Sequence, residues 1–197
     1  MNKLDKPNKR EQLLEQGVNL LLAQGYHGTG LKEILDAVKI PKGSFYQYFE
    51  SKEAFGAEVV THYIEPFIQQ LTDHLNNPEL DALSALQAYF AALIHDLEQG
   101  DFKGGCLLGN LMGEIGDTSE LCRFSLKQAI GRYRDLLVLG LTRAQAEGSV
   151  RADKSAERMA DLLLNTWQGA LLRMKIEQSV MPIRACCEDL LGGYFKA

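Results

Sequence analysis

The sequence predicts an all-α protein of about nine helices. Apolar residues recur at steps of three and four through most of the 197-residue chain, which is the spacing of one helical face. Glycine and proline residues that end helices, such as Gly25, Pro78 and Gly148, separate these segments. No stretch gives a convincing strand. We therefore expect helices that pack on helices, without a sheet.

The first three helices are expected close together in the sequence. They span about residues 8–24, 31–38 and 42–48, with a tight turn between the last two. The third is too short to be stable alone. It must be held by packing, which we assign to Phe45 and Phe49.

The short helix at residues 42–48 is polar on its outer face. Hydrogen-bonding side chains can read base edges, a glycine allows close approach, and Lys and Tyr can contact phosphates. The candidate DNA-binding residues are Lys42, Gly43, Ser44, Tyr46, Gln47 and Tyr48. Thr29 and Lys52 are further candidates for phosphate contact, although Thr29 could instead cap the helix that follows it. A hairpin that only filled space would not need so polar a helix.

Residues 43–53, Gly-Ser-Phe-Tyr-Gln-Tyr-Phe-Glu-Ser-Lys-Glu, resemble the helix-turn-helix signature of TetR-type bacterial transcriptional regulators. The resemblance extends over residues 10–60 and departs from the usual pattern at Ile40-Pro41, where Val-Ser is commoner. It implies a helix-turn-helix DNA-binding domain at residues 1–50 and a ligand-binding and dimerisation domain at residues 51–197. It also implies a DNA-binding regulator that a small-molecule inducer controls. We favour a repressor on a palindromic operator, although the sequence does not distinguish repression from activation.

The second domain begins with a long helix that Ser51 caps. Pro66 lies inside this helix and should bend it. Further helices are expected at about residues 79–98, 106–115, 117–147 and 153–178, and from residue 182 to near the end.

The resemblance implies that the last two helices pair with those of a second subunit, giving a homodimer. The residues permit this arrangement. Gly169, Ala170 and Ala185 are small enough for close helix approach, and Leu190 and Leu191 are apolar. Two heads spaced about 34–36 Å apart would read adjacent major grooves of a palindrome.

Cys106 is a candidate sensor. It follows Gly104-Gly105 at the expected start of a helix, where backbone N–H groups and the helix dipole favour a thiolate. The Gly-Cys-Leu segment resembles that of the electrophile-responsive, NemR-like branch of the family. Lys175 could point inward and stabilise the thiolate, or extend to the surface. Cys106 could also be a small buried residue without redox function.

Other pocket candidates are aromatic residues and methionines on inward helix faces. They are Tyr63, Phe67, Tyr89, Phe90, Met112, Tyr133, Trp167 and Met174. Most should belong to the ordinary core. A pocket of this composition suits a small apolar or aromatic compound that binds reversibly, which is the alternative to a reactive electrophile. Glu114 is expected at a solvated surface position. A third hypothesis for the function is a helical thiol enzyme that uses Cys106, but it would leave the DNA-binding head unexplained.

Composition narrows the class of protein. The chain is 46% hydrophobic and 24% charged, without an apolar run near the ~18 residues of a membrane span. The N-terminus lacks the apolar core of a signal peptide, so we expect a cytoplasmic protein with no membrane partner. The four cysteines include no Cys-x-x-Cys, and the histidines show no ligand spacing with them, so no metal or cofactor is expected.

The net charge of −5 is unusual for a DNA-binding protein. Residues 1–60 are neutral overall, so DNA contact must depend on where individual cations lie. Cations near the head are Lys3, Lys6, Lys9, Arg10, Lys39, Lys42 and Lys52. We therefore expect modest non-specific affinity, with specificity from base contacts and dimer geometry.

Overall fold

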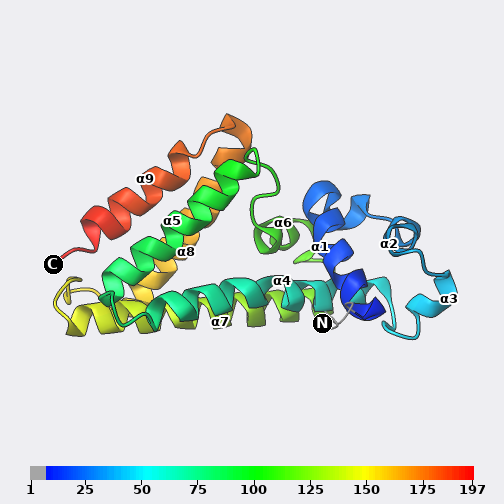
Figure 1. Ribbon diagram of the computed structural model, residues 1–197, viewed down its shortest axis with the longest axis horizontal. Helices are drawn as coiled ribbons and strands as arrows, with labels where there is room; N and C mark the ends of the chain where they lie inside the picture. Colours follow the sequence, from blue (N-terminus) through cyan, green and yellow to red (C-terminus); the bar gives the residue numbers. More distant parts are fainter. Residues whose placement is uncertain (1–7) are drawn as a thin grey trace, which may run out of the picture. The chain divides into compact units, whose positions relative to one another are not determined.

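The computed structural model describes residues 8–197, and its regular elements in that range are helices, apart from one isolated bridge between Val150 and Lys196. The predicted all-α class is thus confirmed for these residues. In order, the elements are α1 (Lys9–Gly28), α2 (Leu31–Val38), α3 (Lys42–Phe45), α4 (Lys52–Leu75), α5 (Ala82–Gln99), α6 (Leu107–Ile115), α7 (Glu120–Ala146), α8 (Ala156–Glu177), α9 (Met181–Asp189) and a final π-helical turn, η1 (Leu190–Tyr194) (Figure 1). Lys3 and Lys6 lie outside the described residues.

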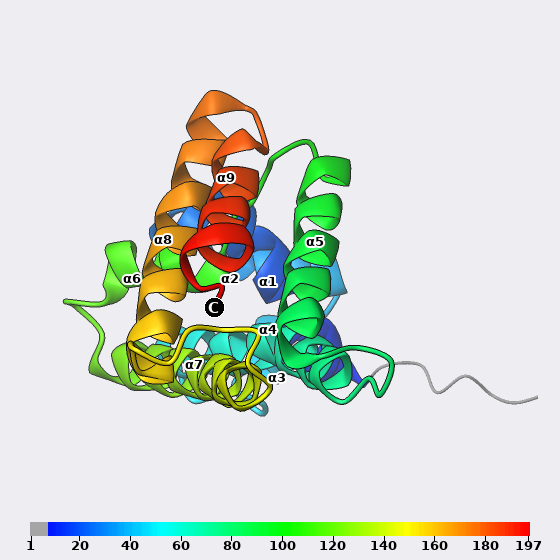
Figure 2. The same cartoon turned by 90° about the vertical axis from the view of Figure 1, so that its left-hand side faces the viewer.

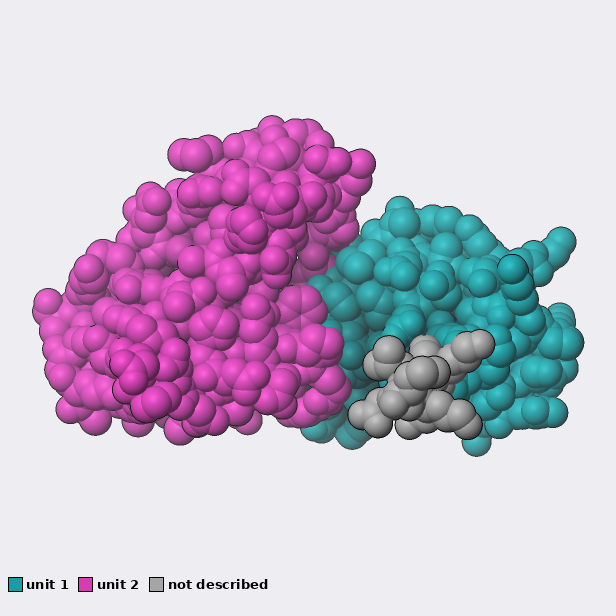
Figure 3. Space-filling view, in the orientation of Figure 1, with its two compact units in different colours: residues 1–63, 107–129 teal, residues 64–106, 130–197 magenta. Residues whose placement is uncertain are grey.

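The chain divides into two compact units (Figure 3). The first comprises residues up to 63 together with residues 107–129, and the second comprises residues 64–106 and 130–197. The first unit therefore extends past the predicted boundary after residue 50. The physical reason is packing: the beginning of α4, all of α6 and the first part of α7 pack with the three N-terminal helices.

Close helix packing builds the first unit. A Cβ atom added at Gly17 of α1 would lie 2.5 Å from Cζ of Phe55 and 2.7 Å from Cγ2 of Val59, both on α4. A residue larger than glycine would not fit at position 17, because α4 packs directly against it. Leu13 and Leu21, one helical turn to either side of Gly17, are fully buried.

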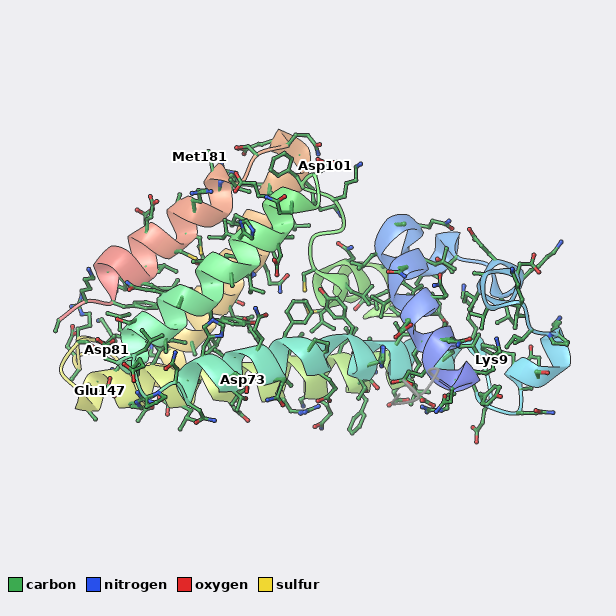
Figure 4. All side chains as sticks on the ribbon, viewed as in Figure 1. Lys9, Asp73, Asp81, Asp101, Glu147 and Met181 are labelled. Atoms are coloured by element: carbon green, nitrogen blue, oxygen red, sulfur yellow. The ribbon has the colours of Figure 1, made fainter. Side chains whose placement is uncertain are left out.

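The second unit contains α5, α8 and α9, with the remaining parts of α4 and α7. α8 and α9 run side by side (Figure 2). Asp81 caps α5 by accepting a hydrogen bond from the Ser84 N–H at 2.7 Å, which lowers the pKa of Asp81. Glu147 lies at the same end of this unit (Figure 4) and accepts the N–H of Ala82 at 2.7 Å.

The third helix and the last helix depart from regular α-helical form. The helix expected at residues 42–48 is α-helical only as far as Phe45 and continues as turns, with the Tyr48 N–H bonding the Phe45 carbonyl three residues back at 2.9 Å. The last helix widens into the π-turn at its Gly192-Gly193 pair, where backbone freedom is greatest. No helix among the described residues is long and apolar enough to span a lipid bilayer.

Candidate DNA-binding surface and sensor site

Three phenylalanine rings hold α3 in place. Phe45 lies on α3, Phe49 follows it, and Phe55 comes from α4. Their ring centroids are separated by 5.2 Å (Phe45–Phe49), 5.5 Å (Phe45–Phe55) and 5.0 Å (Phe49–Phe55), and all three side chains are buried. A helix of four residues has almost no stability of its own, so this aromatic cluster fixes its position.

The opposite face of α3 is open to solvent. Lys42, Gly43 and Gln47 are exposed, and Tyr46 is 53% exposed. A Cβ atom added at Gly43 would meet nothing within 4 Å, so the backbone there can be approached closely. Ser44 and Tyr48 are half-buried at the edges of this face. We call the surface formed by these six residues the α3 face.

Thr29 has a different role from either of those predicted. Its side chain is 0% exposed, and its hydroxyl donates a hydrogen bond to the carbonyl of Gly25 at 2.7 Å. The N-cap of α2 is Gly30, which has no side chain to contribute. Thr29 thus satisfies a carbonyl at the bend of α1, and the prediction of a phosphate contact is wrong because the hydroxyl is buried.

Lys52 is also engaged within the first unit. Its ammonium donates to the carbonyl of Tyr26 at 2.7 Å and lies 4.4 Å from the centre of the Tyr26 ring. Burial lowers the pKa of Lys52 and raises that of Tyr26 to about 12, so Tyr26 stays a neutral phenol near neutral pH. Lys52 therefore ties α4 to the end of α1, which corrects its assignment to DNA phosphate.

The two basic residues at the start of α1 bind neighbouring elements. Lys9, labelled in Figure 4, donates to the carbonyl of Val38 at 3.2 Å. Arg10 pairs with Glu58 and lies 5.3 Å from the centre of the Phe49 ring. These contacts brace the aromatic cluster. Because Lys9 and Arg10 are engaged in these contacts, they offer less positive charge to a nucleic acid. Lys39 and Lys42, in contrast, are exposed.

Glu114 of α6 is an important residue that the sequence reasoning misplaced. Its carboxylate accepts the backbone N–H groups of Tyr26 at 2.7 Å and His27 at 2.6 Å. Gly25 has φ 75° and ψ 176°, which interrupts the helix. The N–H groups of Tyr26 and His27 are therefore available to an acceptor outside the helix. A Cβ atom at Gly25 would lie 2.7 Å from the carboxylate, so glycine is also required sterically. Gly25, which the sequence predicted at the end of a helix, was the available signal.

Cys106 lies in the second unit, immediately before α6. Gly104 and Gly105 have φ values of 79° and 67°, so they form a left-handed turn that leads into it. The Gln168 Nε2 group donates a hydrogen bond to the Cys106 Sγ atom at 3.4 Å. A Cβ atom at Gly105 would lie 3.0 Å from Cδ of Lys175, so the Lys175 stem packs against the residue before the thiol. The structure thus brings Cys106, Gln168 and Lys175 together.

Several predicted pocket residues form a buried cluster in the second unit. The rings of Phe90 and Trp167 are 4.9 Å apart, and those of Tyr89 and Phe90 are 5.3 Å apart. Tyr133 lies 6.2 Å from Tyr89. Met174 is also fully buried, whereas Phe67 and, in the first unit, Tyr63 are half-buried on α4.

Met112 does not fit the predicted pattern. It is 40% exposed, because the buried side of α6 is occupied by Leu108, Leu111 and Ile115. Met112 therefore does not face an enclosed interior within its own unit, which corrects its assignment to an inward helix face.

The outer sides of α8 and α9 carry apolar residues. Leu162, Leu172 and Ile176 of α8 and Met181 at the start of α9 (labelled in Figure 4) are exposed, with Ile176 at 83%. Gly169 is exposed, and nothing lies within 4 Å of its Cβ position. Ala185 is exposed and Leu190 half-buried. Ala170 and Leu191, which were predicted for a subunit interface, are instead buried within the unit, since they face its own core.

Replacing Glu114 with Ala should destabilise the protein by about 2–3 kcal/mol, because two backbone donors lose a charged acceptor. Urea unfolding measures this change. Glu114→Gln, which keeps an acceptor oxygen but not the charge, should cost less. The exposed Asp117→Ala variant serves as the control, with an expected change within about 0.5 kcal/mol. Equal stability of Glu114→Ala and wild type would contradict the anchoring role of this carboxylate.

Comparison with known proteins identifies the family to which the chain belongs. Residues 13–59 match the bacterial regulatory proteins of the tetR family, and residues 82–190 match the tetracyclin repressor-like C-terminal domain. The chain is 36% identical over 174 residues to the HTH-type transcriptional repressor DhaR of Mycobacterium sp., covering 88% of this chain and 86% of that protein.

A second relative is the HTH-type transcriptional repressor NemR of Escherichia coli, 33% identical over 183 residues that cover 93% of this chain and 92% of that protein. The crystal structure of the reduced form of E. coli NemR matches with a TM-score of 0.88 and 31% identity, over 96% of this chain and 98% of that one. This chain is therefore a member of the TetR family of bacterial transcriptional regulators, whose N-terminal helix-turn-helix binds DNA.

Proposed function

We propose that this regulator is a repressor that binds a palindromic operator as a homodimer and is released when a small electrophile modifies Cys106. The observation that carries the DNA-binding part is the α3 face, which is polar and exposed while the aromatic cluster is buried behind it. Gln47 and Ser44 are suited to base edges, and Lys42 and Tyr46 to phosphates or bases. Repression is supported by DhaR and NemR, which are both named as repressors.

Dimerisation is supported by the apolar residues outside α8. Leu162, Gly169 and Ile176 recur every seven residues and so lie along one side of the helix, next to Leu172. Such a stripe is unfavourable in water and permits close approach of a second helix at Gly169. Two α3 faces on one particle would also compensate for the weak binding of a single short helix.

Release through Cys106 is supported by the groups around the thiol. The Gln168 amide donates a hydrogen bond to the sulfur at 3.4 Å, which positions the Cys106 side chain. The stem of Lys175 packs at Gly105 and so keeps a cationic side chain close to the thiol. Cys106 is a free, half-buried cysteine, so a small electrophile can approach its sulfur.

The mechanism would be a shift between two conformations. Covalent change at Cys106 favours a state in which the two heads no longer match the operator spacing. The change in DNA affinity cannot exceed the difference in free energy that the modification makes between the two states.

A reversible, non-covalent inducer is the second candidate. A groove of about 340 Å³ lies between α5 and α9 in the second unit and is lined by Ile94, His95, Glu98, Arg184 and Cys187, among others. It offers room for a small molecule that need not react with a thiol. Turnover by a thiol enzyme is not proposed, because the family consists of regulators.

Lys42→Ala should weaken binding to a duplex selected from a random DNA pool. The slope of log affinity against log salt concentration should fall by about one, because one phosphate contact is lost. Fluorescence anisotropy across a salt series measures both quantities. The matched control is Lys52→Ala, which should lower stability while leaving the salt slope unchanged. The reverse result, with Lys52→Ala alone changing the slope, would reject this assignment.

Ile176→Glu should convert the dimer to a monomer, because a carboxylate would be buried in the apolar interface. Sedimentation at several protein concentrations measures the association constant. Leu139→Glu is the control, since Leu139 is 60% exposed on α7 and lies outside the proposed interface. An undiminished dimer in both Ile176→Glu and Leu172→Glu would exclude α8 as the interface.

Cys106→Ser should bind the operator normally but fail to release it on treatment with N-ethylmaleimide, because serine is a far weaker nucleophile. Cys187→Ser, a change at another half-buried cysteine, is the control and should respond like the wild type. Release is followed by anisotropy, and the modified residue by peptide mass spectrometry. Normal release in Cys106→Ser would leave the reversible inducer as the better explanation.

A further inference from the structure

Lys39 has a backbone conformation that lysine rarely adopts. It ends α2 with φ 56° and ψ 50°, which lies in the left-handed region. A side chain in this region brings its Cβ atom close to the following carbonyl oxygen, whereas glycine has no Cβ and avoids that cost. Glycine is accordingly the usual residue where a helix ends in this conformation. The presence of a lysine at this position therefore needs an explanation.

The hydrogen bonds of the turn hold residue 39 in the left-handed conformation. The Lys39 N–H donates to the carbonyl of Asp36 at 3.2 Å, and the Ile40 N–H donates to the carbonyl of Leu35 at 3.1 Å. Pro41 follows with ψ 150° and fixes the extended entry to α3. Because this bonding pattern ends a helix through a left-handed residue, the strain at Lys39 belongs to the turn itself. It would be relieved by removing the side chain.

The charge of the head supplies a reason for a lysine at the turn. Residues 8–60 contain six lysine and arginine side chains, of which three are engaged with neighbouring elements. The other three are exposed and form no ion pair within residues 8–197, and they are Lys32, Lys39 and Lys42. A head with so few available cations can bind DNA only if each of them lies near a phosphate.

Lys39 lies beside the α3 face. It precedes Lys42, the first residue of α3, by three positions, and the exposed Pro41 lies between them. An element that reads base edges in a groove is flanked by the phosphates that border the groove. An exposed ammonium on the turn that leads into the α3 face is therefore placed to meet the backbone of a bound duplex.

We propose that Lys39 binds a phosphate of the operator beside the α3 face, and that this contact is the reason why a lysine, and not the less strained glycine, occupies the turn. This inference rests on the proposed use of the α3 face for DNA binding. It adds a phosphate-binding residue outside that face, and it gives a function to a strained backbone position.

Stability and DNA binding are then opposed at residue 39. Lys39→Gly relieves the strain, so it should raise the melting temperature by about 2–4 °C for a chain of this size while it weakens DNA binding. Lys39→Asn should be at least as stable as the wild type, because asparagine tolerates the left-handed region, and it should also bind DNA weakly. Lys39→Arg keeps the positive charge and should bind DNA like the wild type. A residue that only formed the turn would not give this pattern.

Fluorescence anisotropy with the duplex selected from a random DNA pool measures binding by the full-length variants, and thermal unfolding measures their stability. Lys39→Gly and Lys39→Asn should each lower the affinity about tenfold near 0.1 M salt, because a dimer loses one phosphate contact in each head. The slope of log affinity against log salt concentration should fall by about as much as in Lys42→Ala.

Two matched controls separate the phosphate contact from other effects. Gln178→Asn changes another exposed residue in the left-handed region, with φ 50°, which ends α8 in the second unit. Lys127→Asn removes an exposed ammonium from α7 and so makes the same change in net charge. Both controls should keep the affinity and the salt slope of the wild type.

Unchanged affinity and slope in Lys39→Gly and Lys39→Asn would overturn the proposal. If Lys42→Ala still lowered the slope in that case, the α3 face would remain the DNA-binding surface, and if it did not, both assignments would be wrong. Weak binding by Lys39→Arg, or an equal loss of affinity in Lys127→Asn, would also overturn the phosphate contact. A melting temperature of Lys39→Gly below that of the wild type would contradict the strain at this turn.

Discussion

The packing of Phe45 against Phe49 and Phe55 is the constraint on which the DNA-binding head depends. α3 has four residues and cannot be stable in isolation, so the packing of these rings determines its orientation. Arg10 covers the Phe49 ring from α1 and pairs with Glu58 on α4, which joins both neighbouring helices to the cluster. The polar groups of α3 can be exposed because its stability comes from the opposite side.

The sequence was sufficient for the fold class and for the α3 face, because both follow from local periodicity. Buried phenylalanines and exposed polar residues alternate within a few positions there. It was insufficient for Lys52 and Glu114, whose partners are contributed by other elements. Lys52 binds a carbonyl 26 residues away, and Glu114 binds N–H groups 88 and 87 residues away. A lone charged residue has the same appearance in a sequence whether it is solvated or paired.

The second unit illustrates the same limit in its apolar interior. Helical spacing identified Tyr89, Phe90, Tyr133 and Trp167 as inward-facing residues, and the structure places all four in its core. Periodicity cannot reveal which polar atom within such a core lacks a partner. That property depends on side-chain geometry at the ångström scale. Likewise, nothing in the sequence around Gln168 indicates its contact with Cys106.

The carboxylate of Glu114 has a consequence for exchanging parts between related regulators. It is supplied by α6, in the middle of the chain, yet it completes the end of α1. A hybrid that joined this N-terminal segment to a foreign C-terminal portion would leave two amides at Gly25 without their acceptor, unless the donor of that portion offered an acid at the equivalent place. The first unit is therefore built from two separate segments of the chain, and a graft of the head must include residues 107–129.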